Sequence, residues 1–98
     1  MAIVRVELHP EADLEFAKQI EYYDEREAGL GQRFYREVIG RLDWISLNPM
    51  VPRFRKTHRR VNLKVFPFYI AYVTQGDLIW VLAVAHGNKK PGYWRERI

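Results

Sequence analysis

Apolar positions recur with two different spacings along the chain. From Ile3 to Leu8 they alternate with Arg5 and Glu7, which is the period of two that is typical of a half-buried strand. Two longer stretches follow at the spacing of an amphipathic helix. Three short apolar runs then alternate with Gly, Pro and polar residues and predict three further strands. The pattern therefore predicts the order strand, helix, helix, strand, strand, strand.

The two predicted helices form a hairpin. The first starts at His9-Pro10, because proline suits the first helical turn. Gly29-Leu30-Gly31 interrupts the pattern, and the second helix ends at Asn48-Pro49. The apolar stripes of the two helices are Ala12, Phe16, Ile20 and Tyr23, then Phe34, Val38, Leu42 and Ile45. Because a short turn makes the helices antiparallel neighbours, we expect their joint apolar face to pack on one face of the sheet.

The second half of the chain starts with a basic loop, residues 50–58, in which Pro52 opposes regular structure and His58 is expected to be exposed. A strand with one buried and one polar face is predicted next. Its buried positions are expected to be Val61, Leu63 and Val65. A strand from Phe66 to Thr74 follows, and Pro67 places its beginning at a boundary or an edge. Gln75-Gly76-Asp77 supplies the turn before the last strand.

The last strand, Leu78 to Ala85, contains no polar residue, which predicts burial on both faces. One layer of helices covers only one of these faces. We therefore expect one alternate set of side chains to pack under the helices and the other to form an apolar trough for a partner. The expected outward set is Ile79, Val81, Ala83 and Ala85. Alternatively, the C-terminal tail folds back and covers the trough.

Length and composition limit the possibilities further. The 98 residues suffice for a single α+β domain, 1–98, with one core. The absence of cysteine excludes disulfides and thiol nucleophiles, and with only three histidines we expect neither a metal site nor a cofactor. No segment reaches the roughly 18 to 20 apolar residues of a membrane span, and no signal peptide is recognisable, so we expect a cytoplasmic protein.

Charge is distributed unevenly along the sequence. Residues 1–52 hold six Lys and Arg against ten Asp and Glu, whereas residues 53–98 hold ten against two. A basic half of this kind suits nucleic acid, an enzyme that handles nucleic acid, or an acidic protein partner; a merely solubilising surface is the alternative. The residues expected to face the target are Arg53, Arg55, Lys56, Arg59, Arg60, Lys89 and Lys90.

Seven short motifs occur in an order and at spacings that resemble the RelE/ParE toxin superfamily, and its ParE-like branch most closely. They are His9-Pro10-Glu11-Ala12, Tyr22-Tyr23, Gly29-Leu30-Gly31-Gln32-Arg33-Phe34, Asn48-Pro49, Phe66-Pro67-Phe68, Ala83-Val84-Ala85-His86 and Pro91-Gly92-Tyr93-Trp94. The resemblance extends from about Val4 to Arg97. It implies a helix hairpin on a small, mainly antiparallel sheet, and the toxin of a bacterial type II toxin–antitoxin pair, associated with growth arrest and plasmid stabilisation. A separately encoded antitoxin would silence this toxin in a hetero-oligomer.

The resemblance implies two different targets. RelE-like members cut messenger RNA on the ribosome with basic side chains and no metal, whereas ParE-like members poison DNA gyrase. The RelE-like motif has basic residues at the places of Arg60, Asn62, Tyr69 and Gly87, and three of these four are absent here. A gyrase poison is therefore the leading hypothesis. A ribosome-dependent endoribonuclease and a non-toxic antitoxin-binding module are the alternatives.

If the chain is a ribonuclease, Arg60, His86 and Tyr93 are its candidate catalytic residues. Histidine is the side chain that most often serves in acid–base catalysis, and His86 lies where the last strand meets a basic loop. Tyr93 matches the terminal aromatic residue of the RelE-like motif. A structural role is the alternative for both: His86 caps a carbonyl or packs on an aromatic ring, and Tyr93 with Trp94 docks the tail on the domain. His9 is expected only to start the first helix.

Overall fold

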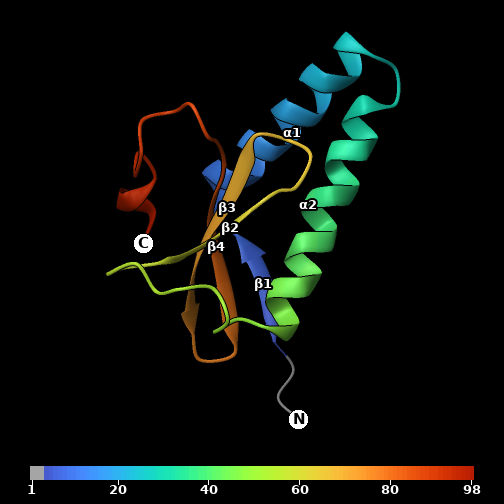
Figure 1. Ribbon diagram of the computed structural model, residues 1–98. Coiled ribbons are helices and arrows are strands. Elements are labelled where there is room, and N and C mark those ends of the chain that lie inside the picture. The colour runs from blue at the N-terminus through green and yellow to red at the C-terminus, as the bar shows by residue number, and fades with distance from the viewer. Residues whose placement is uncertain (1–3) are drawn as a thin grey trace.

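The computed structural model describes residues 4–98 and has the predicted order of elements (Figure 1). Ile3, which was expected in the first strand, lies outside the described residues. The elements are β1 (Arg5–Leu8), α1 (Pro10–Arg26), α2 (Leu30–Leu47), β2 (Arg59–Asn62), β3 (Phe68–Gln75), β4 (Leu78–His86) and the short 3-10 helix η1 (Arg95–Arg97). No helix in this part of the chain is both long and apolar enough to span a membrane.

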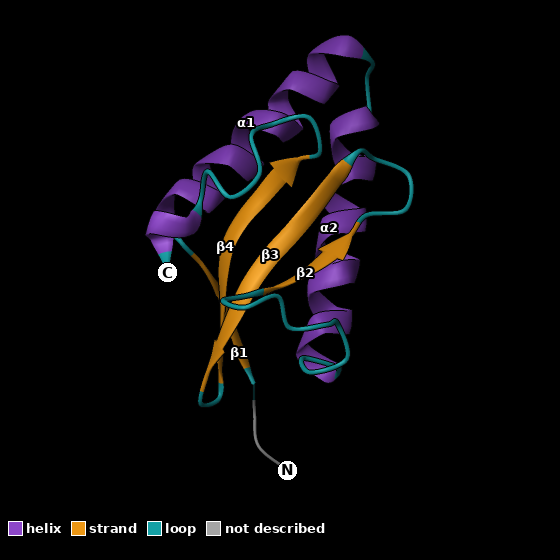
Figure 2. Ribbon diagram, turned by 60° about the vertical axis from the view of Figure 1, so that its left-hand side comes forward, coloured by secondary structure: helices purple, strands orange, loops and turns teal. Residues whose placement is uncertain are grey.

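The four strands form one sheet in the order β1-β4-β3-β2. β1 is parallel to β4, and the other two pairings are antiparallel, so the prediction of a mainly antiparallel sheet is confirmed. Both helices lie on one face of this sheet, as Figure 2 shows. Their buried stripes, which centre on Phe34 and Val38, form the main core together with Ile70, Tyr72 and Val81.

The helix hairpin follows from local chemistry. The ring Nδ1 of His9 accepts the backbone N–H of Glu11 at 3.0 Å and caps α1, as expected for a residue that starts a helix. Between the helices, the N–H of Gly31 donates to the Asp24 carboxylate at 2.7 Å. A Cβ on Gly31 would lie 2.3 Å from the carbonyl oxygen of Ile20. The two helices therefore approach each other closely at a position that only glycine can occupy without displacing its neighbours.

The strand that was predicted through Val65 ends at Asn62 instead. Val65 is 73% exposed, so its predicted burial is wrong, whereas Val61 and Leu63 are buried. The backbone turns away because the Glu37 carboxylate on α2 accepts the N–H groups of Lys64 and Val65. A hydrogen-bonding partner on a helix thus replaces the neighbouring strand, and no alternation pattern can reveal such a partner.

A β-bulge divides β4 into two halves, and the alternation of side chains between the two faces of the sheet shifts by one position between these halves. Ala71 pairs with Ala83 and Tyr72 with Val81, so Leu82 has no partner in β3. Such an extra residue shifts the alternation of side chains by one position. Ile79 and Val81 therefore pack in the main core, whereas Ala83 and Ala85 belong to a second cluster on the opposite face. The prediction that these four residues form one outward set is wrong.

The second face of the sheet is also covered. Its apolar cluster contains Tyr69, Ala71, Leu82, Ala83, Ala85 and Trp94. The exposed fraction is at most 1% at each of the four positions expected to line an open trough. Trp94, which is 2% exposed, comes from the C-terminal end and packs against this cluster. The alternative in which the tail folds back is confirmed, and burial of β4 on both faces is explained.

Candidate functional site

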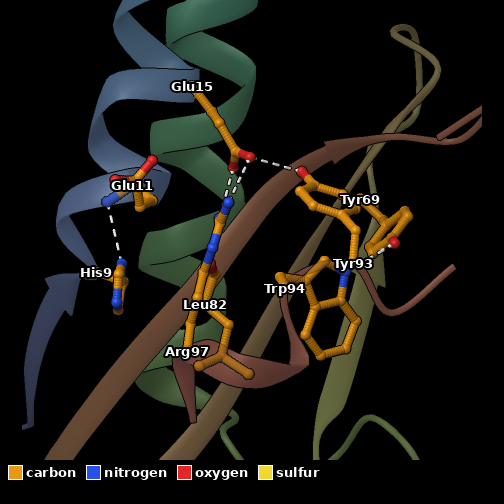
Figure 3. A network of polar contacts seen from close by, with 8 residues as sticks. All are labelled: His9, Glu11, Glu15, Tyr69, Leu82, Tyr93, Trp94 and Arg97. Carbon is orange, nitrogen blue, oxygen red and sulfur yellow. Dashed lines mark hydrogen bonds and ion pairs between the residues drawn. The ribbon is translucent and has the colours of Figure 1, made fainter. Parts of the chain in front are cut away.

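The C-terminal segment, residues 93–98, is fastened to α1 through one carboxylate. Glu15 accepts hydrogen bonds from both terminal nitrogens of Arg97, each at 3.0 Å, and from the Tyr93 hydroxyl at 2.8 Å (Figure 3). Arg97 also donates to the carbonyl oxygen of Leu82 at 3.0 Å. The Arg97 and Glu15 side chains are only 15% and 19% exposed, so this ion pair is screened less than a surface pair.

Trp94 anchors the middle of this attachment. Its indole N–H donates to the Tyr69 hydroxyl at 3.0 Å (Figure 3). The edge of its ring system meets the His58 ring, with 4.5 Å between the centroids. His58 is therefore 6% exposed, and its predicted exposure is wrong. Burial lowers the pKa of His58, and the nearby charges of Arg55, Arg95 and Arg60 lower it further.

The two candidates for acid–base chemistry, His86 and Tyr93, are both engaged in structural contacts. The Nδ1 of His86 accepts the N–H of Asn88 at 2.9 Å, and its ring packs edge-on against Phe68 with 5.0 Å between the centroids. Burial and the hydrogen bond to the Glu15 carboxylate raise the pKa of Tyr93 well above its ordinary value. The contacts of both side chains fit the structural roles that were the alternative to catalysis.

Arg60 lies apart from these two residues. Its guanidinium group is stacked over the Tyr69 ring, 3.8 Å from the centroid, and donates to the Asn62 side chain at 3.3 Å. Arg60 lines a different hollow from the one that His86 and Tyr93 share. The three candidate catalytic residues are therefore not assembled around one point.

The hollow that contains His86 and Tyr93 measures about 440 Å³ and lies between α1 and the C-terminal segment. Lys89 belongs to it, with its ammonium group 5.0 Å from the centre of the Tyr93 ring. Glu15 and Arg97 also line it and pair with each other, and Glu11, Lys18 and Gln19 of α1 complete its polar lining. The hydrogen-bonding groups of Glu15, Tyr93 and Arg97 are thus used by the fold itself.

A second hollow, of about 490 Å³, lies on the sheet face opposite the helices, between residues 53–60 and the C-terminal segment. We call it the basic basin after the five cations that line it, Arg53, Arg55, Lys56, Arg60 and Arg95. Four of them were expected to face the target. Of the other residues predicted for that patch, Arg59 instead donates to the carbonyl oxygen of Pro52 at 2.6 Å, and Lys90 is exposed outside both hollows.

The sequence pattern did not predict two residues of these sites: Glu15, which holds the C-terminal segment, and Arg95, which lines the basic basin. Glu15 looks like any acidic residue in the first half of an amphipathic helix, and only the folded tail gives it partners. Arg95 belongs to the basic second half of the sequence, so the uneven charge distribution could have indicated that it joins the basic patch. Residues 4–98 include no group of three or more His, Asp or Glu side chains placed to hold a metal ion.

Comparisons with known proteins give a consistent result. The family described as "ParE toxin of type II toxin-antitoxin system, parDE" matches residues 6–91. A solved structure titled "Chromosomal ParDE TA system from P. aeruginosa" has the same fold, with a TM-score of 0.73. The two chains are 12% identical, and the match covers 86% of this chain and 96% of the other. No curated protein matches the chain significantly.

Proposed function

Because the chain belongs to the ParE toxin family of type II toxin–antitoxin systems, we propose that it arrests growth by poisoning DNA gyrase and that a cognate antitoxin neutralises it. Membership of this family implies an antitoxin partner and a toxin–antitoxin complex. As a poison, the protein would hold gyrase on cleaved DNA and would have no active site of its own.

The observation that supports a poison over a ribonuclease is the state of Tyr93. Its hydroxyl donates to Glu15 and thereby fixes the C-terminal segment to α1. The pKa of Tyr93 is raised by burial and by this carboxylate, so its hydroxyl stays protonated. A metal-free ribonuclease needs groups that exchange protons and stabilise developing charge at the scissile phosphate. Tyr69 and Gly87 occupy two places where the RelE-like motif carries arginine, and Tyr69 is buried. A binding poison needs none of these groups.

The direct test is a cleavage assay with purified gyrase, supercoiled plasmid and the full-length chain. We expect linear DNA, covalently attached to gyrase, to accumulate. In cells, induction should trigger DNA breaks and the SOS response before any loss of messenger RNA. Early codon-specific cuts in messenger RNA with intact DNA would contradict gyrase poisoning and support the ribonuclease.

For the antitoxin, we propose contacts along β4 that include Ala83 and Ala85. Both lie beneath the C-terminal segment, so an antitoxin that reaches them has to displace residues 93–98. Ile79 and Val81 are not part of this proposal, because they lie under the helices. Amide hydrogen exchange of residues 93–98 should accelerate when the antitoxin binds. Unchanged or slower exchange would place the antitoxin elsewhere.

A further inference from the structure

The basic basin concentrates positive charge, and no acidic side chain lines it. Arg53, Arg55, Lys56, Arg60 and Arg95 line it, and neither Asp nor Glu is among its lining residues. The ion pairs formed within residues 4–98 involve other arginines, namely Arg5, Arg33 and Arg97. Five uncompensated cations around one hollow repel one another, and a bound polyanion would relieve this cost.

The loop that carries three of these cations has a defined conformation. Arg55 and His58 form an isolated β-bridge, in which the Arg55 N–H donates to the carbonyl oxygen of His58 at 2.7 Å. Between them, Lys56 has a φ of +61°, the only positive value at a non-glycine residue among residues 4–98. Such a conformation is costly for lysine. The tight turn therefore fixes where Arg55 and Lys56 leave the backbone.

The wall and rim of the basin supply flat surfaces as well as charge. The Arg60 guanidinium group lies over the buried Tyr69 ring, with its central carbon 3.8 Å from the ring centroid. Phe54, at the rim, is 55% exposed and has the Arg59 guanidinium group 5.3 Å from its ring centre. An exposed aromatic ring beside several arginines is a typical binding surface for a nucleic-acid strand, because bases stack on rings and phosphates pair with guanidinium groups.

We propose that the basic basin binds the phosphodiester backbone of a nucleic-acid strand and that Phe54 stacks on an adjacent base. The biological setting rests on the proposed function: with gyrase, the strand would be the DNA that the enzyme holds. Binding of the strand does not itself depend on gyrase, because the cations and the Phe54 ring all belong to this chain. An acidic protein segment would satisfy the charge but would make no use of an exposed ring between arginines.

The experiment measures binding of the purified full-length chain to fluorescently labelled single-stranded DNA, without gyrase, by fluorescence anisotropy over rising salt concentrations. A duplex and an RNA of the same sequence, and a polyglutamate peptide, serve as parallel probes. We expect binding to the nucleic acids that weakens steeply with salt, and strongest binding to a single strand because its bases are free to stack. No binding at low salt, or tighter binding of polyglutamate, would overturn the proposal.

The test variant is Arg53→Gln/Arg55→Gln, because neither side chain has a hydrogen bond or an ion pair within residues 4–98. The matched control is Lys18→Gln/Arg36→Gln, which removes the same charge from exposed positions on the two helices. The basin variant should bind DNA about tenfold more weakly, with a salt slope lower by about two, one for each lost phosphate contact. The control should stay near wild type.

Equal losses in both variants would show that only net charge matters and would overturn the proposal. A Phe54→Ala variant should selectively weaken binding of the single strand; equal weakening of the duplex would contradict stacking. A chain that binds no DNA but still traps cleaved gyrase complexes would refute this inference alone. A chain that binds DNA through the basin and traps no complex would refute the proposed function alone.

Discussion

Three titratable side chains near the C-terminal end are held by three different contacts. His86 accepts an N–H two residues ahead, His58 lies against Trp94, and Tyr93 donates to Glu15. Each contact holds its side chain in one position. Single substitutions at these residues therefore separate structural roles from chemical ones.

The first such test concerns toxicity. We expect His86→Gln and Tyr93→Phe each to retain most of the growth arrest, because both changes keep the size of the side chain and a binding poison needs no acid–base chemistry. Tyr93→Phe also loses one hydrogen bond to Glu15 and should lower the free energy of unfolding by about 1 kcal/mol. Growth on induction, together with thermal melting of the purified variants, checks this. A folded His86→Gln variant that has lost toxicity by orders of magnitude would instead indicate catalysis.

The second test concerns pH. The pKa of His58 is lower in the folded protein than in the unfolded chain, so the unfolded chain takes up this proton first as the pH falls. The free energy of unfolding should therefore decrease once the pH drops below about 6.5, and this contribution stops growing below the folded-state pKa. Urea unfolding at neutral pH and near pH 5 should show a smaller pH effect in His58→Gln than in wild type. Equal pH effects in both would refute this assignment.

For single residues, the sequence predicted a role correctly only where the side chain contacts residues next to it in the chain. His9 caps the helix that begins one residue later, and its role was predictable because capping is local. The burial of His58 depends on Trp94, which approaches from 36 positions further along the chain. Likewise, nothing near Glu15 in the sequence indicates that residues 93 and 97 will bind it.

At the scale of elements, the helix hairpin depends on how closely its two helices approach. Gly29, with a φ of +87°, precedes α2, and Gly31 lies against the last turns of α1. The two glycines serve different purposes: the first permits a left-handed backbone and the second permits contact. Only the second is a packing constraint between elements.

A pair of substitutions on α2 isolates that constraint. Gly31→Ala places a Cβ 2.3 Å from the backbone oxygen of Ile20, so we expect a loss of about 1 to 3 kcal/mol in the free energy of unfolding. Gly40→Ala on the same helix meets nothing within 4 Å and should stabilise the protein by about 0.5 to 1 kcal/mol. Denaturant unfolding of both variants gives the comparison. If Gly31→Ala left the free energy of unfolding unchanged, the helices would be able to move apart there without loss of stability.

Periodicity predicted the type and order of the elements well, and it failed where one element modifies another. The hairpin, the mainly antiparallel sheet and the doubly buried last strand are all confirmed. The end of β2 was wrong because Glu37 captures the backbone at Lys64. The facing of Ile79 and Val81 was wrong because the bulge at Leu82 shifts the alternation. Both errors have tertiary causes, which a pattern along one segment does not contain.

Across the whole molecule, one carboxylate joins the beginning of the fold to its end. Glu15→Gln keeps the shape of the side chain but removes the charge that holds Arg97. We expect this change to lower the free energy of unfolding by about 1 to 3 kcal/mol and to speed hydrogen exchange at the Trp94 indole. Glu21→Gln, on the exposed side of the same helix, is the control and should be nearly neutral. Slow indole exchange in Glu15→Gln would show that Trp94 alone fastens the segment.

The pairing of β1 with β4 has a consequence for synthesis. A growing chain leaves the ribosome with its N-terminal end first, and in the sheet formed within residues 4–98 the strand at residues 5–8 pairs with residues 78–81. The helix hairpin needs only nearby residues and is the first part able to assemble, while the sheet cannot be completed until β4 has emerged. The fold therefore becomes complete only after β4 has been synthesised. Until then, the apolar strands are open to chaperones.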